Sequence, residues 1–332
     1  MTRAMLLCAG LSTRLGALSH DRPKPMLPVC DIPIVAYGIA LLVGHGVRDI
    51  VINLHHQGEI VERTFGNAAL GARITYSREA ELLGTGGGVK HALALLDPED
   101  TDEPFVVMNG KLIFDVDLTA LLSAHARDPE VLGTMVVRRV GASEAKAWGA
   151  VHVEPDAAGR LRVRDVLAEG EHMYGGIHVT RASVMRRLPD GEACVIRQGY
   201  LPWMHAGEPV AAFEAGPGFF AESSTPARYL ATNRALVGGQ KLRFAPGPLT
   251  GVDERAHVHG SARIVHPVKI GECAHVGENA VVGPDVVIGA HALIEPGAHL
   301  ERAVVWPHAR ASGVITDAVI TPRAILPCAG DA

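Results

Sequence analysis

The chain has 332 residues, of which 48% are hydrophobic and 20% are charged, and its formal net charge is −5. This length and apolar content are enough for two domains with hydrophobic cores. The negative charge argues against a nucleic-acid partner held by a broadly basic surface. The longest apolar run, residues 32–44, is too short to cross a bilayer, and the start of the chain lacks a signal-peptide pattern. We therefore expect a cytoplasmic protein with no nucleic-acid partner and no membrane partner.

The five cysteines are scattered along the chain, and no two of them form a C-x-x-C pair. This usage argues against a disulfide framework or a zinc site and fits a reducing compartment. Lysine is scarce, with 6 residues against 25 arginines. A lysine in a conspicuous motif is therefore a candidate for a specific role.

The first two thirds of the chain alternate short apolar runs with helical patterns. We expect strands at residues 4–8, 49–54, 74–77, 104–108 and 133–138. We expect helices at residues 34–44, 57–65, 88–96 and 118–126. This alternation predicts a doubly wound, Rossmann-like α/β domain with a mixed sheet over residues 1–237. In such folds ligands bind at the carboxyl ends of the strands.

The last quarter of the chain has a period of six residues. Ten positions in succession are apolar when the chain is read in steps of six: Val252, Val258, Ile264, Ile270, Val276, Val282, Ile288, Ile294, Leu300 and Trp306. A hexapeptide β-helix gives this period, because each side of its triangular coil takes one repeat and turns one aliphatic side chain inward. Residues 252–332 resemble the left-handed hexapeptide β-helix domain. Residues 238–251, which contain Pro246 and Pro248, read as a linker.

A loop that follows the first expected strand carries features of a phosphate-binding site. It reads Leu7-Cys-Ala-Gly10-Leu-Ser-Thr-Arg14-Leu-Gly16, and Lys24 follows ten residues after Arg14. Backbone N–H groups of such a Gly/Ser/Thr loop can bind phosphate, and the two cations add charge. The alternative reading of the loop alone is a surface turn with solvated cations.

The full string resembles the signature of the sugar-phosphate nucleotidyltransferases, with P-K-P-M-L-P-V at residues 23–29. Among these, it is most similar to the mannose-1-phosphate guanylyltransferases. Further matching motifs are E-L-L-G-T-G-G-G at 81–88, W-G-A at 148–150, Y-G-G-I at 174–177 and F-A-E with T-P-x-x-Y-L-x-x-N at 220–233. The resemblance implies the reaction of an NTP, with GTP favoured, and a mannose- or heptose-like sugar 1-phosphate to give an NDP-sugar and pyrophosphate.

The resemblance also implies roles for individual residues. Arg14 would stabilise the leaving pyrophosphate, and Lys24 would contact the α-phosphate region. The positions implied for nucleotide binding are Leu7, Ala9, Gly10, Leu11, Ser12, Thr13, Gly84, Thr85 and Asn109. Those implied for sugar binding are Gly149, Gly175 and Gly176. The sugar-phosphate oxygen is already ionised at pH 7, so the reaction needs positive charge and backbone donors more than a strong general base.

The sequence departs from the family at its metal site. The family places a Mg²⁺-binding Asp after Asn-Gly, where this chain has Lys111. An ammonium cannot ligate Mg²⁺, which prefers oxygen ligands. The second metal-binding Asp aligns with Glu222, so Glu222 is the one candidate metal ligand. The family's E-K-P lysine is also absent, and Arg162 or Arg164 could supply that charge instead.

Three interpretations of Lys111 remain open at this point. It is an exposed lysine without a role, or a catalytic cation that places its charge where the metal would sit, or the mark of a paralogue that binds sugar nucleotides as a regulatory or scaffolding subunit. A requirement for Mg²⁺ is left open with them. For the tail, an acyltransferase site with a catalytic His is weaker than a structural role or a homo-oligomer interface, such as that of a dimer.

Overall fold

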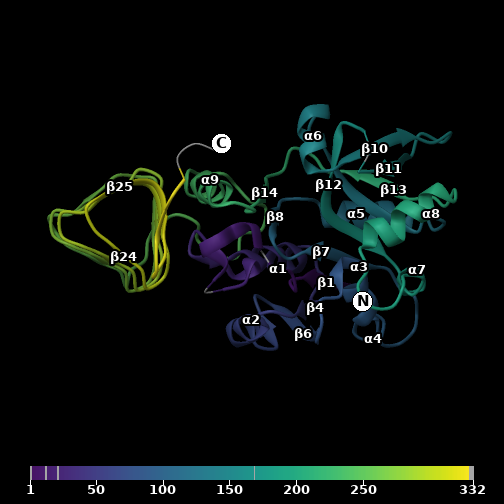
Figure 1. Cartoon of the computed structure of the whole chain (residues 1–332), viewed down its shortest axis with the longest axis horizontal. Coiled ribbons are helices and arrows are strands. Elements are labelled where there is room, and N and C mark those ends of the chain that lie inside the picture. The colour runs from purple at the N-terminus through teal and green to yellow at the C-terminus, as the bar shows by residue number, and fades with distance from the viewer. Residues whose placement is uncertain (1, 12, 21, 168, 329–332) are drawn as a thin grey trace. The chain divides into compact units, whose positions relative to one another are not determined.

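The computed structural model describes residues 2–11, 13–20, 22–167 and 169–328 (Figure 1). The chain forms two compact units. The first consists of Met1–Leu11, Gly38–Gly110 and Phe114–Gly218. The second consists of Ser12–Tyr37, Lys111–Ile113 and Phe219–Ala332. The segment that contains Lys24 therefore belongs to the same unit as the C-terminal repeats.

The first unit is built on a ten-stranded mixed sheet with the order β10-β11-β13-β9-β12-β7-β1-β4-β6-β5. Its strands are β1 (Arg3–Leu7), β4 (Asp49–Leu54), β5 (Ala68–Ala69), β6 (Ala72–Arg78), β7 (Phe105–Asn109), β9 (Gly133–Arg139), β10 (Ala150–Pro155), β11 (Leu161–Val166), β12 (His172–Thr180) and β13 (Ala211–Glu214). Strands β7, β1, β4 and β6 are parallel neighbours, whereas β12 runs antiparallel to both β7 and β9. The mixed α/β fold predicted from the sequence is confirmed.

Helices of the first unit connect these strands. They are α2 (Gly58–Phe65), α3 (Gly84–His91), α4 (Leu93–Leu96), α5 (Leu118–Ala126), α6 (Ala142–Trp148), α7 (Ala182–Met185), a π-helical turn (Val195–Tyr200) and α8 (Leu201–His205). Helix α1 (Ile34–Gly44) begins in the second unit and continues into the first. The helix expected at 88–96 begins earlier, at Gly84, and is divided at Ala92. Among the described residues no helix has the length and hydropathy needed to span a bilayer.

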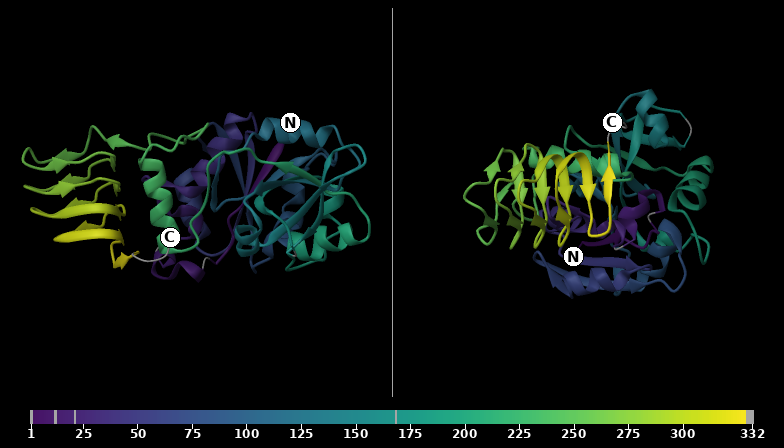
Figure 2. Two further views of the ribbon diagram at one scale, coloured as in Figure 1. Left: turned by 90° about the horizontal axis from the view of Figure 1, so that it is seen from above. Right: turned by 60° about the vertical axis from the view of Figure 1, so that its left-hand side comes forward.

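The second unit contains a parallel β-helix, which appears as a triangle in Figure 1 and as stacked rungs in Figure 2. Its strands are β15 (Gly251–Val252), β16 (His257–Val258), β17 (Arg263–Ile264), β18 (Val268–Ile270), β19 (His275–Val276), β20 (Val281–Val282), β21 (Val286–Ile288), β22 (Leu293–Ile294), β23 (His299–Val305), β24 (Arg310–Ala311), β25 (Val314–Ile320) and β26 (Ile325–Pro327). Paired positions of the early coils are 18 residues apart, as in Val258 and Val276. The hexapeptide period therefore gives the expected coil.

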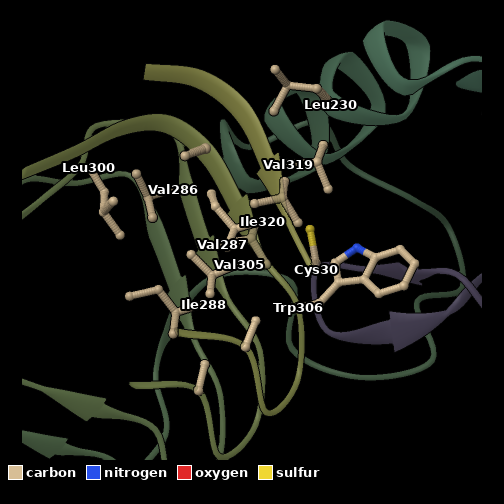
Figure 3. Packing of buried hydrophobic residues seen from close by; sticks show 14 of the residues in the cluster. Cys30, Leu230, Val286, Val287, Ile288, Leu300, Val305, Trp306, Val319 and Ile320 are labelled. Atoms are coloured by element: carbon tan, nitrogen blue, oxygen red, sulfur yellow. The ribbon is translucent and has the colours of Figure 1, made fainter. Parts of the chain in front are cut away.

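One face of the β-helix is buried on both sides. The three residues of β18 and of β21 are all buried, and so are the last three of β23 and of β25. Helix α9 (Pro226–Val237) contacts β21, β23 and β25. Residues of the segment 12–37, including Leu27 and Cys30, join the same apolar cluster. Figure 3 shows Cys30, Trp306 and Leu230 of α9 around these strands.

The repeat loses its register at the fourth coil. Ile288 pairs with Val305 rather than with Trp306, so this coil step has 17 residues instead of 18. Trp306 therefore leaves the position that the period of six predicts for it. It lies buried beside α9, where its ring meets that of Tyr229 edge to face.

The remaining described elements belong largely to the second unit. They are η1 (Thr13–Ser19), η2 (Lys24–Met26), β2 (Pro28–Val29), β3 (Ile32–Pro33), β8 (Leu112–Phe114) and β14 (Phe220–Glu222). Strands β2 and β3 form a small hairpin, and β8 pairs with β14. These short pieces position the charged residues described next.

Candidate functional site

Three candidate binding positions of the first unit lie at the same end of three neighbouring strands. Leu7 ends β1 and pairs with Asn109, which ends β7. The antiparallel register of β7 and β12, which pairs Met108 with Ile177, places Gly176 across from Asn109. Gly110 N–H donates to the Leu7 carbonyl at 3.0 Å and joins the two strand ends. Ligands of α/β sheets of this kind bind at this end, outside the carboxyl ends of the parallel strands.

A buried polar network fixes the loops at this end of the strands. The Asn53 amide oxygen accepts from Cys8 N–H at 2.7 Å, and its nitrogen donates to Glu79 Oε1 at 2.6 Å. The other Glu79 oxygen accepts from Leu83 N–H at 3.0 Å. One carboxylate therefore connects the loop after β1, the end of β4 and the start of α3. Burial raises the pKa of the Cys8 thiol far above its ordinary value, so this residue stays uncharged.

The start of α3 is fitted closely against the backbone near Ala193. Gly84 has a positive φ of 69°, and a Cβ there would lie 2.7 Å from the Ala193 carbonyl oxygen. Gly86 N–H donates to the same oxygen at 2.7 Å, and Thr85 Oγ1 accepts from Val195 N–H at 3.1 Å. Glycine is required at residue 84 both by its backbone conformation and by this approach.

The three glycines predicted to contact the sugar lie close together in the sheet register. Gly149 precedes β10, which pairs with β12 through Ala150 and Met173. Gly175 and Gly176 lie at the irregularity of β12, where the pairing with β9 shifts register. A Cβ at Gly175 would lie 2.6 Å from the Phe114 ring. The structure therefore brings together the two separate motifs from which these positions were inferred.

Arg162, one of the two arginines considered for binding the sugar phosphate, already pairs with two carboxylates of the protein. Its buried guanidinium forms ion pairs with Asp128 and with Asp156, the latter at 2.9 Å. Arg164 lies 3.7 Å from Glu154. Arg162 therefore has a structural partner set that a substrate phosphate would have to displace.

In the second unit, three charged side chains converge. Lys111 Nζ lies 3.0 Å from Glu222 Oε1, and Lys24 Nζ lies 3.2 Å from the same oxygen. Lys111 stands in the turn before β8, and Glu222 ends β14, so the pairing of these two strands explains their approach. Lys24 is 5% exposed. The Lys111 side chain is 37% exposed, and its contact with the buried Glu222 carboxylate is the observation that favours a role for it.

Charge balance decides the ionisation of Glu222. Burial alone would raise its pKa, but the ammonium groups of Lys111 and Lys24 outweigh this effect and hold the pKa below its ordinary value. Glu222 is therefore a carboxylate at neutral pH. The three groups together carry one net positive charge.

The residues around Glu222 do not fit a magnesium ion. Mg²⁺ takes oxygen ligands in near-octahedral geometry, whereas the one carboxylate oxygen that points into this cluster already faces two ammonium groups. Across the described part of the chain, no three His, Cys, Asp or Glu side chains form a group that could hold a metal ion.

Three of the predicted site residues fall wholly or partly outside the described part of the chain. Ser12 lies outside the described residues, as do the side chains of Thr13 and Arg14. Ala9 is buried and Leu11 is exposed. The role of Arg14 stays a prediction from the sequence.

Two residues of the network, Asn53 and Glu79, were not predicted from the sequence. Asn53 lies inside an apolar strand motif, D-I-V-I-N-L, where a single buried amide is the signal that could have identified it. Glu79 lies four residues before Leu83. The sequence motif at residues 81–88 begins instead with Glu81, which the structure leaves exposed. Burial, which the sequence does not give, separates the two.

Comparison with known proteins identifies the families that the two parts of the chain resemble. The model of the nucleotidyl transferase family matches residues 3–167, and that of the bacterial transferase hexapeptide repeat matches residues 267–302. Mannose-1-phosphate guanyltransferase of Hypocrea jecorina is 28% identical over 276 residues, which are 81% of this chain and 73% of that protein. N-acetylmuramate alpha-1-phosphate uridylyltransferase of Caulobacter vibrioides is 30% identical over 232 residues, which are 64% of this chain and 94% of that protein.

A solved structure supports the fold. HddC from Yersinia pseudotuberculosis, crystallised with GMP-PN, is similar with a TM-score of 0.58 and 20% identity, covering 70% of this chain and 98% of that one. The α/β fold and the hexapeptide repeat thus have counterparts among known proteins. The chain belongs to the nucleotidyltransferase family and carries a C-terminal hexapeptide-repeat β-helix.

Proposed function

We propose that this protein is a sugar-1-phosphate guanylyltransferase that uses GTP and a mannose- or heptose-like sugar 1-phosphate. An oxygen of the sugar phosphate attacks the α-phosphorus of GTP. The bond between the α-phosphorus and its bridging oxygen breaks, and pyrophosphate leaves with the electron pair. The guanyltransferase and uridylyltransferase relatives are about equally similar, at 28% and 30% identity, so the choice of GTP rests on the motif resemblance and UTP is the competing substrate to test.

The observation that carries the proposal is the lysine pair at Glu222. Two phosphate groups must be brought together for transfer, and their mutual repulsion is the main obstacle. Lys24 and Lys111, held on one carboxylate oxygen, supply two cations with one countercharge. We assign Lys24 to the α-phosphate region and Lys111 to the charge that a metal supplies in the family. Arg14 is assigned to the leaving pyrophosphate.

The loops of the first unit are assigned to binding rather than to charge. Gly84 and Thr85 would position the base and ribose, and Gly10, Leu11, Ser12 and Thr13 would hold the phosphates. Leu7, Ala9 and Asn109 are also assigned to nucleotide binding. Gly149, Gly175 and Gly176 would contact the sugar. The fixed backbone at Gly84 and the network of Glu79 support this part, because pre-positioned loops do not need to reorganise during the reaction.

The experiment is pyrophosphate release from GTP or UTP with mannose 1-phosphate or a heptose 1-phosphate. Each reaction is run with Mg²⁺ and with EDTA. We expect turnover with GTP that persists in EDTA, and its loss in Lys24→Ala but not in Lys146→Ala, an exposed lysine of α6. Failure of every nucleotide and sugar combination to release pyrophosphate would reject the enzyme proposal.

A second candidate function is a regulatory or scaffolding subunit that binds sugar nucleotides without turning them over. Lys111 and the missing E-K-P lysine favour it, because both depart from catalytic family members. Calorimetry with GDP-mannose distinguishes the two candidates. Binding without turnover supports the subunit, and absence of binding to any NDP-sugar rejects it.

The partner proposed for the tail is a second copy of the chain. Strands β15, β16 and β17 form the first coil, and each pairs with one neighbouring strand in the described sheets. Val252 in this coil is 45% exposed. Open strand edges and apolar ends favour association. Sedimentation of the wild type and of Val252→Glu tests this, with a dimer expected only in the wild type.

A further inference from the structure

Lys24 lies between two contacts that both lead to one aromatic pair. Two residues before it, the Arg22 guanidinium lies over the Trp306 ring at 4.9 Å from the centroid. Four residues after it, the Pro28 carbonyl oxygen accepts a hydrogen bond from the Tyr229 hydroxyl. Trp306 Nε1–H donates to that same hydroxyl at 3.0 Å. Both flanks of Lys24 are thus held by Trp306 and Tyr229.

The side chains of Trp306 and Tyr229 are held rigidly and are excluded from solvent. Trp306 is 1% exposed, and Tyr229 is fully buried. Their rings meet edge to face at an interplanar angle of 79°. A buried hydroxyl that both donates and accepts a hydrogen bond has little rotational freedom. The Tyr229 hydroxyl therefore fixes the position of the Pro28 carbonyl relative to α9.

The same helix fixes the partner of Lys24. Tyr229 lies in the first turn of α9, and Glu222 precedes that helix by four residues. Thr225 caps the helix by accepting from Arg228 N–H at 3.2 Å. A shift of α9 would therefore move Glu222 and the Pro28 carbonyl together.

Further along, the segment after Lys24 is fastened to the same elements. Cys30 N–H donates to the Asn233 side chain on α9 at 2.8 Å. Ala290 N–H, in the turn that follows β21, donates to the Asp31 carboxylate at 3.0 Å. The β-helix and α9 therefore form a continuous support beneath the lysine segment.

We propose that Trp306, through Tyr229, is a positioning residue for Lys24, so that the β-helix is part of the scaffold of the candidate active site. The loss of one residue from the coil, which moves Trp306 out of the six-residue period, is what brings its indole to Tyr229. The catalytic consequence rests on the proposed function, because it takes Lys24 as a phosphate-binding cation. The structural consequence, a Lys24 held in place by Trp306, does not.

The first experiment measures the accessibility of Lys24 without using activity. Reductive methylation followed by mass spectrometry gives the labelling rate of each lysine in wild type, Trp306→Phe and Tyr229→Phe. Lys269 is the internal control, since it is 7% exposed and lies on β18 of the same β-helix. Tyr229→Phe keeps the ring and removes the hydroxyl. If Trp306→Phe does not fold, the labelling of Lys24 in Tyr229→Phe tests the proposal.

Two control variants match these changes in the first unit. Trp203 also carries an arginine over its ring, Arg187 at 4.7 Å, and Tyr76 also donates to a carbonyl, that of Gly66 at 2.6 Å. Trp203→Phe and Tyr76→Phe should leave the labelling of Lys24 unchanged. We expect Trp306→Phe and Tyr229→Phe to raise Lys24 labelling at least about threefold, with Lys269 unchanged. An unchanged Lys24, or Lys24 and Lys269 rising together, overturns the proposal.

The second experiment is a double-mutant cycle on turnover. We expect Tyr229→Phe to lower kcat about tenfold in the wild-type background and to have no further effect in Lys24→Ala, because it acts through Lys24. The KM for GTP should change less than kcat. Equal, additive losses in both backgrounds would overturn the positioning role. If wild type shows no turnover, the proposed function fails, and the labelling experiment still decides whether Trp306 holds Lys24.

Discussion

Lys111 and Glu222 form an ion pair, with Nζ 3.0 Å from Oε1, at the two positions that the sequence resemblance aligns with metal-binding carboxylates of the family. We propose that this pair of opposite charges stands in place of a carboxylate pair that would attract a divalent cation. Lys24 approaches the same oxygen. Under this proposal, side chains of the protein supply the positive charge that a metal would bring.

Replacing Lys111 by Asp should restore the acidic pair. We expect Lys111→Ala to lower kcat/KM by about 10²–10³-fold, as for loss of a group that stabilises transition-state charge. Lys111→Asp should regain turnover only when Mg²⁺ is added. The measurement is the metal dependence of pyrophosphate release, and equal activity of all three proteins in EDTA would contradict the assignment.

Glu222→Gln should weaken the second unit. The change removes the carboxylate charge that faces both ammonium groups, and disrupting a buried ion pair of this kind costs about 3 kcal/mol. Glu59→Gln, on the exposed side of α2, is the matched control. Chemical denaturation gives the free energies of unfolding. A Glu222→Gln protein as stable as the control would show that the ion pairs contribute little.

Gly88→Ala tests the buried network of the first unit. A Cβ at residue 88 would lie 2.6 Å from Glu79 Oε1 and 2.9 Å from Asn53 Nδ2. We expect a loss of about 1–3 kcal/mol in the free energy of unfolding and weaker GTP binding, since the displaced Glu79 also holds the Leu83 amide. Gly216→Ala is the control, because no atom lies within 4 Å of its added Cβ. Equal GTP affinity of the two variants would show that the network of Asn53 and Glu79 does not contribute to nucleotide binding.

The pH dependence of stability should report on Asp31. Burial raises the pKa of Asp31 from 3.8 to about 6, against the opposing effects of the Ala290 amide, Lys269 and Arg22; Asp253 raises it slightly further. The folded state therefore binds this proton more tightly than the unfolded state. This contribution is largest below pH 4 and is lost as the pH rises to about 6.

Asp31→Asn removes that contribution. Relative to wild type, its free energy of unfolding should rise by about 1–3 kcal/mol between pH 4 and pH 7. Asp100→Asn, at an exposed position, should follow the wild-type curve. Parallel curves for wild type and Asp31→Asn would show that Asp31 does not titrate as its burial predicts.

Much of the fold follows from local sequence patterns. The apolar run at 34–44 and the β-branched run at 49–54 give α1 and β4 with the expected bounds. The period of six gives the early coils. It fails at Trp306, because one coil step is shorter by one residue and the period of six does not predict this shortening.

The candidate site was predictable in its parts but not in its arrangement. Motifs identified Lys24, Lys111 and Glu222 separately, and Glu222 was interpreted as a metal ligand. Its contact with Lys24 joins residues 198 positions apart, which sequence spacing does not reveal. Residues 12–37 were likewise expected to belong with the first domain, whereas their core is shared with the β-helix.

The most direct test of this account is turnover of GTP and mannose 1-phosphate by wild type in the presence of EDTA, compared with Lys111→Ala. The account predicts pyrophosphate release by wild type without added metal and a loss of about 10²–10³-fold in Lys111→Ala. Turnover that requires Mg²⁺ in wild type and is unchanged in Lys111→Ala would contradict it.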